Sequence, residues 1–233
     1  MKLLLILFVF TACASQSNLK FEEEKYDALR SESLHGHTPL RLENYKKKLT
    51  FVNDSLYTDR LFSTNKKSSM YWNALGVNKL NKGEYSQALF NFKLALGLAK
   101  NSQNKAIIIN NQGIVFAKLG HQEQASAMFK MANRTNPKAL TPRYNLSMIY
   151  LANNWNKKAA RILVALYKKK PNGYIFAKNL SIAYYNLGQY TKAAGVLSIF
   201  PSHLHQKHNM QNFLEKIANK NLTSKKEIQI SKR

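Results

Sequence analysis

A motif that recurs four times restricts the possible folds of this 233-residue chain more than any other feature. The copies begin at Trp72, Ile109, Arg143 and Ala177, so the last two steps are 34 residues long and the first is three residues longer. Each copy has a small residue, then a turn residue, then an alanine. The small residues are Gly76, Gly113, Ser147 and Ser181, the turn residues are Gly83, Gly120, Asn154 and Gly188, and the alanines are Ala88, Ala125, Ala159 and Ala193. A period of this length is typical of helical hairpins, which stack because one hairpin cannot bury its apolar face alone.

The residues at fixed places in each copy resemble the tetratricopeptide repeat. The matching residues are Trp72, Leu75, Gly76, Ala88, Phe92, Ala125, Phe129, Pro137 and Pro171. We expect the small residues where the two helices of a copy cross, and a left-handed conformation at each turn residue. The resemblance implies an all-α superhelix of about four helix-turn-helix repeats, at residues 69–102, 106–139, 140–173 and 174–207.

Two amphipathic stretches flank the repeats. After them, apolar residues fall on one helical face at Met210, Phe213, Leu214, Ile217 and Ala218. This spacing predicts a capping helix over 208–220, followed by a basic disordered tail over 221–233. Before the repeats, an apolar face at Leu42, Tyr45, Leu49, Val52 and Leu56 predicts a helical segment within 39–68.

The N-terminus, "MKLLLILFVFTACAS", has the layout of a secretory signal peptide. "FTAC" resembles a bacterial lipobox, with Phe10 where leucine is usual, and Cys13 is the one cysteine of the chain. This interpretation predicts a signal peptide over 1–12, lipidation of Cys13, and a flexible tether over 13–38. In the lipoproteins that this N-terminus resembles, a residue other than aspartate after the cysteine favours the outer membrane, so Ala14 implies an outer-membrane lipoprotein facing the periplasm. Ala12-Cys13-Ala14 also fits ordinary signal peptidase, which would release a soluble periplasmic or secreted protein.

The chain is strongly basic, with a formal net charge of +24. Residues 69–207 hold nineteen Lys and Arg against Glu84 and Glu123, which leaves +17 on the repeats. Such a surface predicts an anionic partner: acidic protein, anionic lipid or nucleic acid. Aromatic residues do not alternate with Lys and Arg on one face, which makes nucleic acid the less favoured partner.

The repeat register also predicts a partner-binding groove along the first helices of the repeats. Its members are Asn73, Val77, Leu80, Asn110, Ile114, Ala117, Tyr144, Met148, Leu151, Lys178, Ile182 and Tyr185. The central position, Val77, Ile114, Met148 and Ile182, is apolar in every copy, which suits an extended or helical peptide. Alternatively, the N-terminal helical segment of the chain itself fills this groove.

The sequence contains no motif of a catalytic site, so we expect no enzyme, no cofactor and no metal site. Three imidazoles cluster in "HLHQKH", at His203, His205 and His208, and three such groups can bind a metal. We interpret this stretch instead as a solvated loop before the capping helix.

The stretches "NNQGIVFAKLGHQEQA" and "KNLSIAYYNLGQYTKAAGVL" are similar to the lipoproteins of tight-adherence (Flp) pilus systems, in which N-N-x-G and N-L motifs recur. The resemblance covers about residues 70–200 and implies a scaffold that binds a pilus or secretin component in the cell envelope. Pilotin-type lipoproteins are a competing family. The alternative hypothesis is a polyanion-binding or DNA-binding protein that acts through its basic surface.

Overall fold

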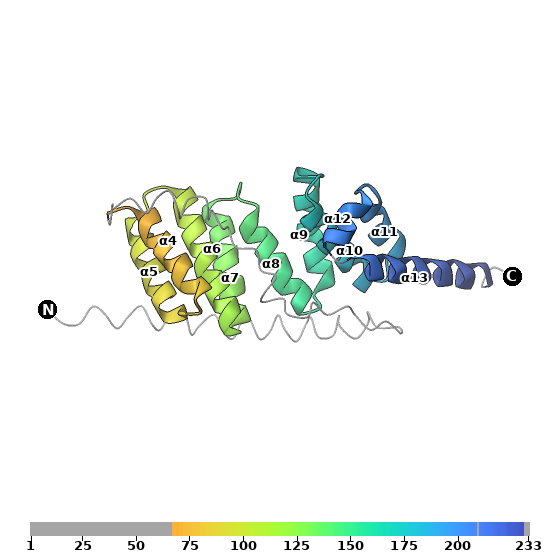
Figure 1. The fold of residues 1–233 in the computed structure, drawn as a ribbon, viewed down its shortest axis with the longest axis horizontal. Helices are drawn as coiled ribbons and strands as arrows, with labels where there is room; N and C mark the ends of the chain where they lie inside the picture. Colours follow the sequence, from red (N-terminus) through yellow and green to blue (C-terminus); the bar gives the residue numbers. More distant parts are fainter. Residues whose placement is uncertain (1–66, 209, 231–233) are drawn as a thin grey trace. The chain divides into compact units, whose positions relative to one another are not determined.

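The computed structural model describes residues 67–208 and 210–230. Every regular secondary-structure element in these residues is an α-helix. The helices, labelled as in Figure 1, are α4 Ser69–Asn81, α5 Tyr85–Leu98, α6 Ser102–Leu119, α7 Gln122–Thr135, α8 Thr141–Ala152, α9 Asn156–Lys169, α10 Tyr174–Asn186, α11 Tyr190–Ser198, α12 Ser202–Lys207 and α13 Gln211–Ile230. The predicted signal peptide, Cys13, the tether and residues 39–66 lie outside the described residues.

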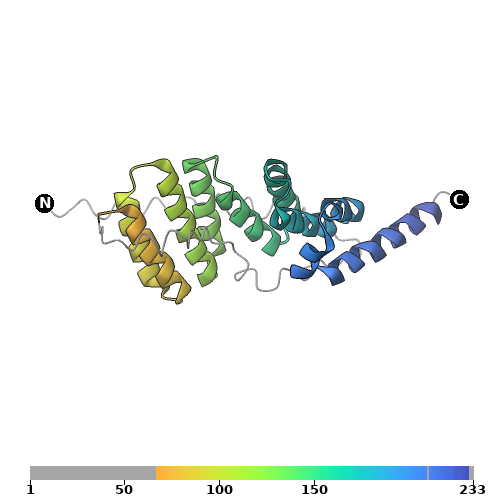
Figure 2. The same ribbon diagram turned by 45° about the horizontal axis from the view of Figure 1, so that its top comes forward.

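The helices pack as four hairpins in chain order. α4 packs on α5, α6 on α7, α8 on α9 and α10 on α11, while α5–α6, α7–α8 and α9–α10 contacts join successive hairpins (Figures 1 and 2). The predicted all-α repeat fold is therefore confirmed. We call the first helix of each hairpin helix A and the second helix B.

Each hairpin turns at the residue predicted for it. Gly83, Gly120 and Gly188 have φ of 78°, 92° and 72°, and Asn154, with φ of 59°, is the one non-glycine residue with positive φ in the described chain. Left-handed backbone suits glycine, and asparagine tolerates it better than most residues. The four turns therefore share one backbone geometry, which fixes how helix B folds back on helix A.

In the first two hairpins, the small residue of helix A lies against an aromatic ring of helix B. A Cβ atom on Gly76 would lie 2.5 Å from Cε1 of Phe92, and one on Gly113 would lie 2.7 Å from Cε1 of Phe129. Both rings are fully buried. In the fourth hairpin, Ser181 Oγ instead donates to the Ala193 carbonyl at 2.7 Å. The helix crossing predicted at the small residues is confirmed in the first, second and fourth hairpins, whereas Ser147 Oγ in the third donates to the Tyr144 carbonyl of its own helix at 2.6 Å.

The hairpins differ in length for local reasons. The extra residues of the first repeat step accompany an α6 of 18 residues, and α11 has only nine because Pro201 follows and cannot continue a helix. α13 continues to Ile230, ten residues beyond the predicted end of the capping helix and into the predicted disordered tail. No Gly or Pro interrupts "NLTSKKEIQI", so the sequence has no strong helix breaker there.

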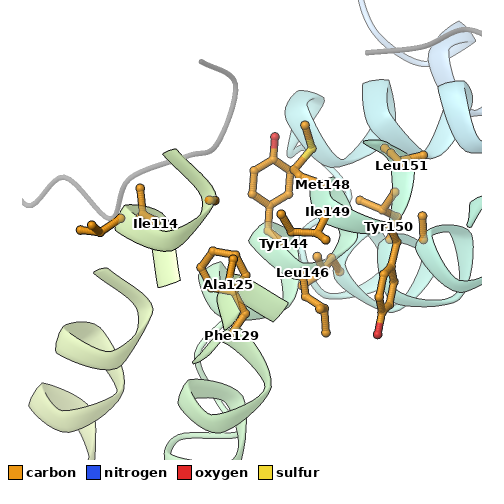
Figure 3. Close-up of a cluster of buried hydrophobic side chains, with 14 of the residues drawn as sticks. Ile114, Ala125, Phe129, Tyr144, Leu146, Met148, Ile149, Tyr150 and Leu151 are labelled. Atoms are coloured by element: carbon orange, nitrogen blue, oxygen red, sulfur yellow. The ribbon is translucent and has the colours of Figure 1, made fainter. Parts of the chain in front are cut away.

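The core follows the hairpins in two clusters. The larger runs from Val77 to Ala183 and includes Ile114, Phe129 and Met148 (Figure 3). The smaller joins α10 and α11 to the C-terminal segment through Met210, Phe213 and Ile217. These residues cover the end of the last hairpin, as the capping-helix spacing predicts.

Candidate functional site: the helix A row and its amide ladder

The structure brings the predicted groove residues together along the A helices, but inside the protein. Ten of them are buried: Asn73, Val77, Leu80, Asn110, Ile114, Ala117, Tyr144, Met148, Leu151 and Ile182. Lys178 and Tyr185 are half-buried. The apolar members belong to the two core clusters, so they stabilise the array itself. Binding of a partner along this row stays a prediction.

The polar members of the row form buried hydrogen bonds between hairpins. Asn111 Nδ2 donates to Asn73 Oδ1 at 3.0 Å, and Asn145 Nδ2 donates to Asn110 Oδ1 at 2.9 Å. Asn179 Nδ2 donates to the Tyr144 hydroxyl at 2.9 Å. We call these three bonds the amide ladder. Each one links an A helix to the next A helix, and each of its six residues is buried.

The ladder follows a diagonal through the repeats. The acceptors Asn73, Asn110 and Tyr144 share one repeat position, and Lys178 is its fourth member. The donors come from the position one residue later in the following repeat. An amide buried without a partner is destabilising, so this pairing favours one register between neighbouring hairpins.

The fourth acceptor position ends the ladder differently. Lys178 Nζ donates to the His208 carbonyl at 3.2 Å, which ties α10 to the segment before α13. Tyr185, the other half-buried member of the row, packs edge-on against Tyr190 and Phe213. Two predicted groove residues thus join the last hairpin to the C-terminal segment, Lys178 by a hydrogen bond and Tyr185 by a ring contact.

The interpretation of "HLHQKH" as a solvated loop is wrong. Residues Ser202–Lys207 form α12, and His205 is buried. Its Nε2 lies 3.1 Å from the Phe200 carbonyl, which can only accept, so Nε2 carries the hydrogen. Its Nδ1 lies 2.9 Å from the Tyr174 hydroxyl, and the Tyr174 ring stacks on His208 at 4.7 Å. Burial raises the pKa of the Tyr174 hydroxyl.

The described residues also limit the chemistry that can be assigned. Within 67–208 and 210–230, no three or more His, Cys, Asp or Glu side chains are grouped so as to hold a metal ion. None of the helices described there has the length and apolar character needed to cross a bilayer. The geometry of this part of the chain is that of a packed array with a hydrogen-bonded interior.

The fold is that of a tetratricopeptide-like helical-repeat protein. No protein-family model matches the chain. Among curated proteins, it is similar to the photosystem I assembly protein Ycf3 of several cyanobacteria. It is 26% identical to that of Synechococcus sp. strain CC9605 and 29% identical to that of Rippkaea orientalis, each over 118 residues, covering 45% of this chain and 68% of the relative.

Solved structures with the same arrangement include MamA of Desulfovibrio magneticus RS-1, residues 41 to the end. Its TM-score is 0.52 at 20% identity, over 72% of this chain and 98% of that one. A chain of the Cut9–Hcn1 hetero-tetramer of the APC/C also has a TM-score of 0.52, at 17% identity, over 76% of this chain and 36% of that one. At these identities the likeness shows the fold alone.

Proposed function

We propose that this chain is a scaffold that binds another protein during the assembly of a larger complex. The observation that carries the proposal is the stack of four hairpins held in register by the amide ladder, which gives a partner a firm, extended surface. The similarity to a photosystem I assembly protein supports a role of this class. The proposal gives the chain no catalytic role.

In its finer form, the proposal places the scaffold in the bacterial cell envelope. The N-terminal sequence supports an outer-membrane lipoprotein anchored through Cys13, and the N-N-x-G and N-L motifs support a role in pilus or secretion-system assembly. Replacement of Cys13 by serine should abolish lipid labelling and release the protein from membranes. Unchanged labelling would contradict the anchor.

The partner-binding test uses the polar end of the row. Lys178→Glu reverses the charge at the half-buried ammonium that bonds to the His208 carbonyl. Lys100→Glu, in the exposed turn between α5 and α6, makes the same change in net charge and is the matched control. The tagged full-length proteins are cross-linked in the native cells and the captured proteins are identified.

We expect proteins captured by the wild type to be lost from Lys178→Glu and kept by Lys100→Glu. Lys178→Gln removes the charge but keeps a side chain of similar length, so it tests the same site if the charge reversal disturbs folding. Circular dichroism checks the folding of each variant. Identical captured proteins in all four chains would contradict binding at this end of the row.

A second candidate function is polyanion binding, favoured by the net charge of +17 on residues 69–207. Phosphate contacts release counterions, so DNA affinity should then fall steeply as salt rises. Titration of an oligonucleotide at several salt concentrations tests this function, and absence of binding at moderate salt contradicts it.

A further inference from the structure

One repeat position is apolar in every copy and lies on helix B or, in the last hairpin, directly after it. Six places after the shared alanine of each repeat come Leu94, Met131, Ala165 and Ile199. Met131 is 38% exposed and Ile199 is 60% exposed, Ala165 is exposed, and Leu94 is half-buried. An exposed helix position is usually polar, and packing of the core does not require an apolar residue there.

Cations accompany these apolar side chains. Arg134 and Lys168 follow Met131 and Ala165 by three residues, which places each on the same side of its helix as the apolar member. Lys93 follows Phe90 by three residues, and Lys130 precedes Arg134 by four, so these two cations lie beside the same set. All four are exposed. Across α5, α7, α9 and α11 the sequence contains a single acid, Glu123, in the first turn of α7. Phe90, 62% exposed and four residues before Leu94, lies on the same side of α5.

We call this set the outer face: Phe90, Leu94, Met131, Ala165 and Ile199 with Lys93, Lys130, Arg134 and Lys168. Its apolar members are spread over four hairpins, one on each except for Phe90 and Leu94, which share the first. A protein partner usually buries a contiguous apolar centre surrounded by polar residues. A run of bases would need several aromatic platforms, and Phe90 is the one aromatic among the large apolar side chains exposed in the described residues.

The arrangement suits a fluid, anionic surface. Isolated apolar side chains can insert separately between lipid headgroups, while neighbouring Lys and Arg remain at the level of the phosphates. We propose that the outer face lies on an anionic phospholipid bilayer and so holds the A helices toward the protein partner. This contact goes beyond the scaffold function and does not depend on acylation of Cys13.

Vesicle binding tests the proposal. Every sample is the full-length chain with Cys13→Ser, so that acylation does not contribute, and the probe is phosphatidylcholine vesicles with or without phosphatidylglycerol. The outer-face variant is Lys130→Gln/Arg134→Gln/Lys168→Gln. The matched control, Lys82→Gln/Lys100→Gln/Lys105→Gln, loses the same charge from exposed residues in turns and on helix A.

We expect binding of the parent chain to require phosphatidylglycerol. The outer-face variant should lose about a hundredfold in partition coefficient, since each cation near an anionic bilayer contributes about 1 kcal/mol. The control should lose less than tenfold, because its cations do not face the bilayer. Equal losses in the two variants, or binding of the parent chain without phosphatidylglycerol, would overturn the proposal.

A charge-neutral variant separates lipid from other polyanions. Met131→Gln keeps every cation and removes one inserting side chain, so vesicle binding should fall several-fold. Binding of a DNA oligonucleotide or of polyglutamate should not change. If Met131→Gln leaves vesicle binding intact while the outer-face variant weakens vesicle, DNA and polyglutamate binding alike, the face is a general polyanion surface and the lipid proposal is wrong.

Discussion

The amide ladder makes a quantitative prediction about stability at Asn145. Asn145→Ala removes the 2.9 Å bond to Asn110 Oδ1, and Asn110 is fully buried, so its oxygen cannot turn to water. Leaving such a group without its partner costs about 1–3 kcal/mol. Asn145 Oδ1 has no partner in the described structure, and its removal offsets part of that cost. We therefore expect a net loss of about 1–2 kcal/mol in the free energy of unfolding.

A double-mutant cycle isolates the bond itself. Asn110→Ala, Asn145→Ala and the double variant are unfolded in urea and followed by far-UV circular dichroism. The two residues contact each other, so the double variant should be more stable than the sum of the single effects predicts, by about 1 kcal/mol. Asn172→Ala, in the exposed turn before α10, is the control and should change stability by less than about 0.5 kcal/mol.

The refuting result is additivity. If the two single effects add within about 0.3 kcal/mol, the amides do not stabilise one another, and the ladder does not favour the register of the hairpins. An equal loss of stability for Asn172→Ala and Asn145→Ala would also refute the reasoning. It would show that the loss at Asn145 does not arise from the burial of its hydrogen bond.

Further predictions concern the hairpin crossings, a turn and the buried tyrosine. Gly113→Ala should lower the free energy of unfolding by about 1–3 kcal/mol, because the new Cβ would meet Phe129. Gly195→Ala should raise it by about 0.5–1 kcal/mol, because Gly195 lies in mid-helix with open space around it. Urea unfolding measures both changes. Asn154→Ala should cost about 1 kcal/mol by the same assay, since its left-handed backbone disfavours alanine. Burial raises the pKa of Tyr174, so the folded state holds this proton more tightly than the unfolded state. Its contribution to stability is complete below the ordinary pKa of about 10 and is lost as pH rises through the raised pKa. Thermal unfolding at alkaline pH should show this loss in the wild type and a smaller one in Tyr174→Phe.

The sequence predicts contacts within one hairpin well. Gly76 and Phe92, like Gly113 and Phe129, are 16 residues apart, so the same pair of repeat positions meets in both hairpins. The left-handed turns follow from one position in the same way, because backbone geometry alone requires a residue that accepts positive φ.

Contacts between hairpins are harder to predict. The ladder partners are 38, 35 and 35 residues apart and occupy neighbouring positions of the repeat, so comparing one position at a time does not pair them. The signal that could have revealed these pairs is the recurrence of asparagine at neighbouring repeat positions, at Asn110, Asn111 and Asn145. His205 was missed because its partner, Tyr174, lies on another helix, and a short polar stretch gives no sign of such a neighbour.

The amide ladder also gives the array two different ends. The first hairpin has Ala74 at the donor position, so it can only accept, and the last has Lys178 at the acceptor position, where its ammonium donates to the C-terminal segment. An internal hairpin both donates and accepts. Duplication of residues 140–173 would therefore insert a hairpin that accepts from its successor and donates to its predecessor, leaving both ends intact. The bonding rule permits arrays of other lengths, and the terminal residues decide where an array begins and stops.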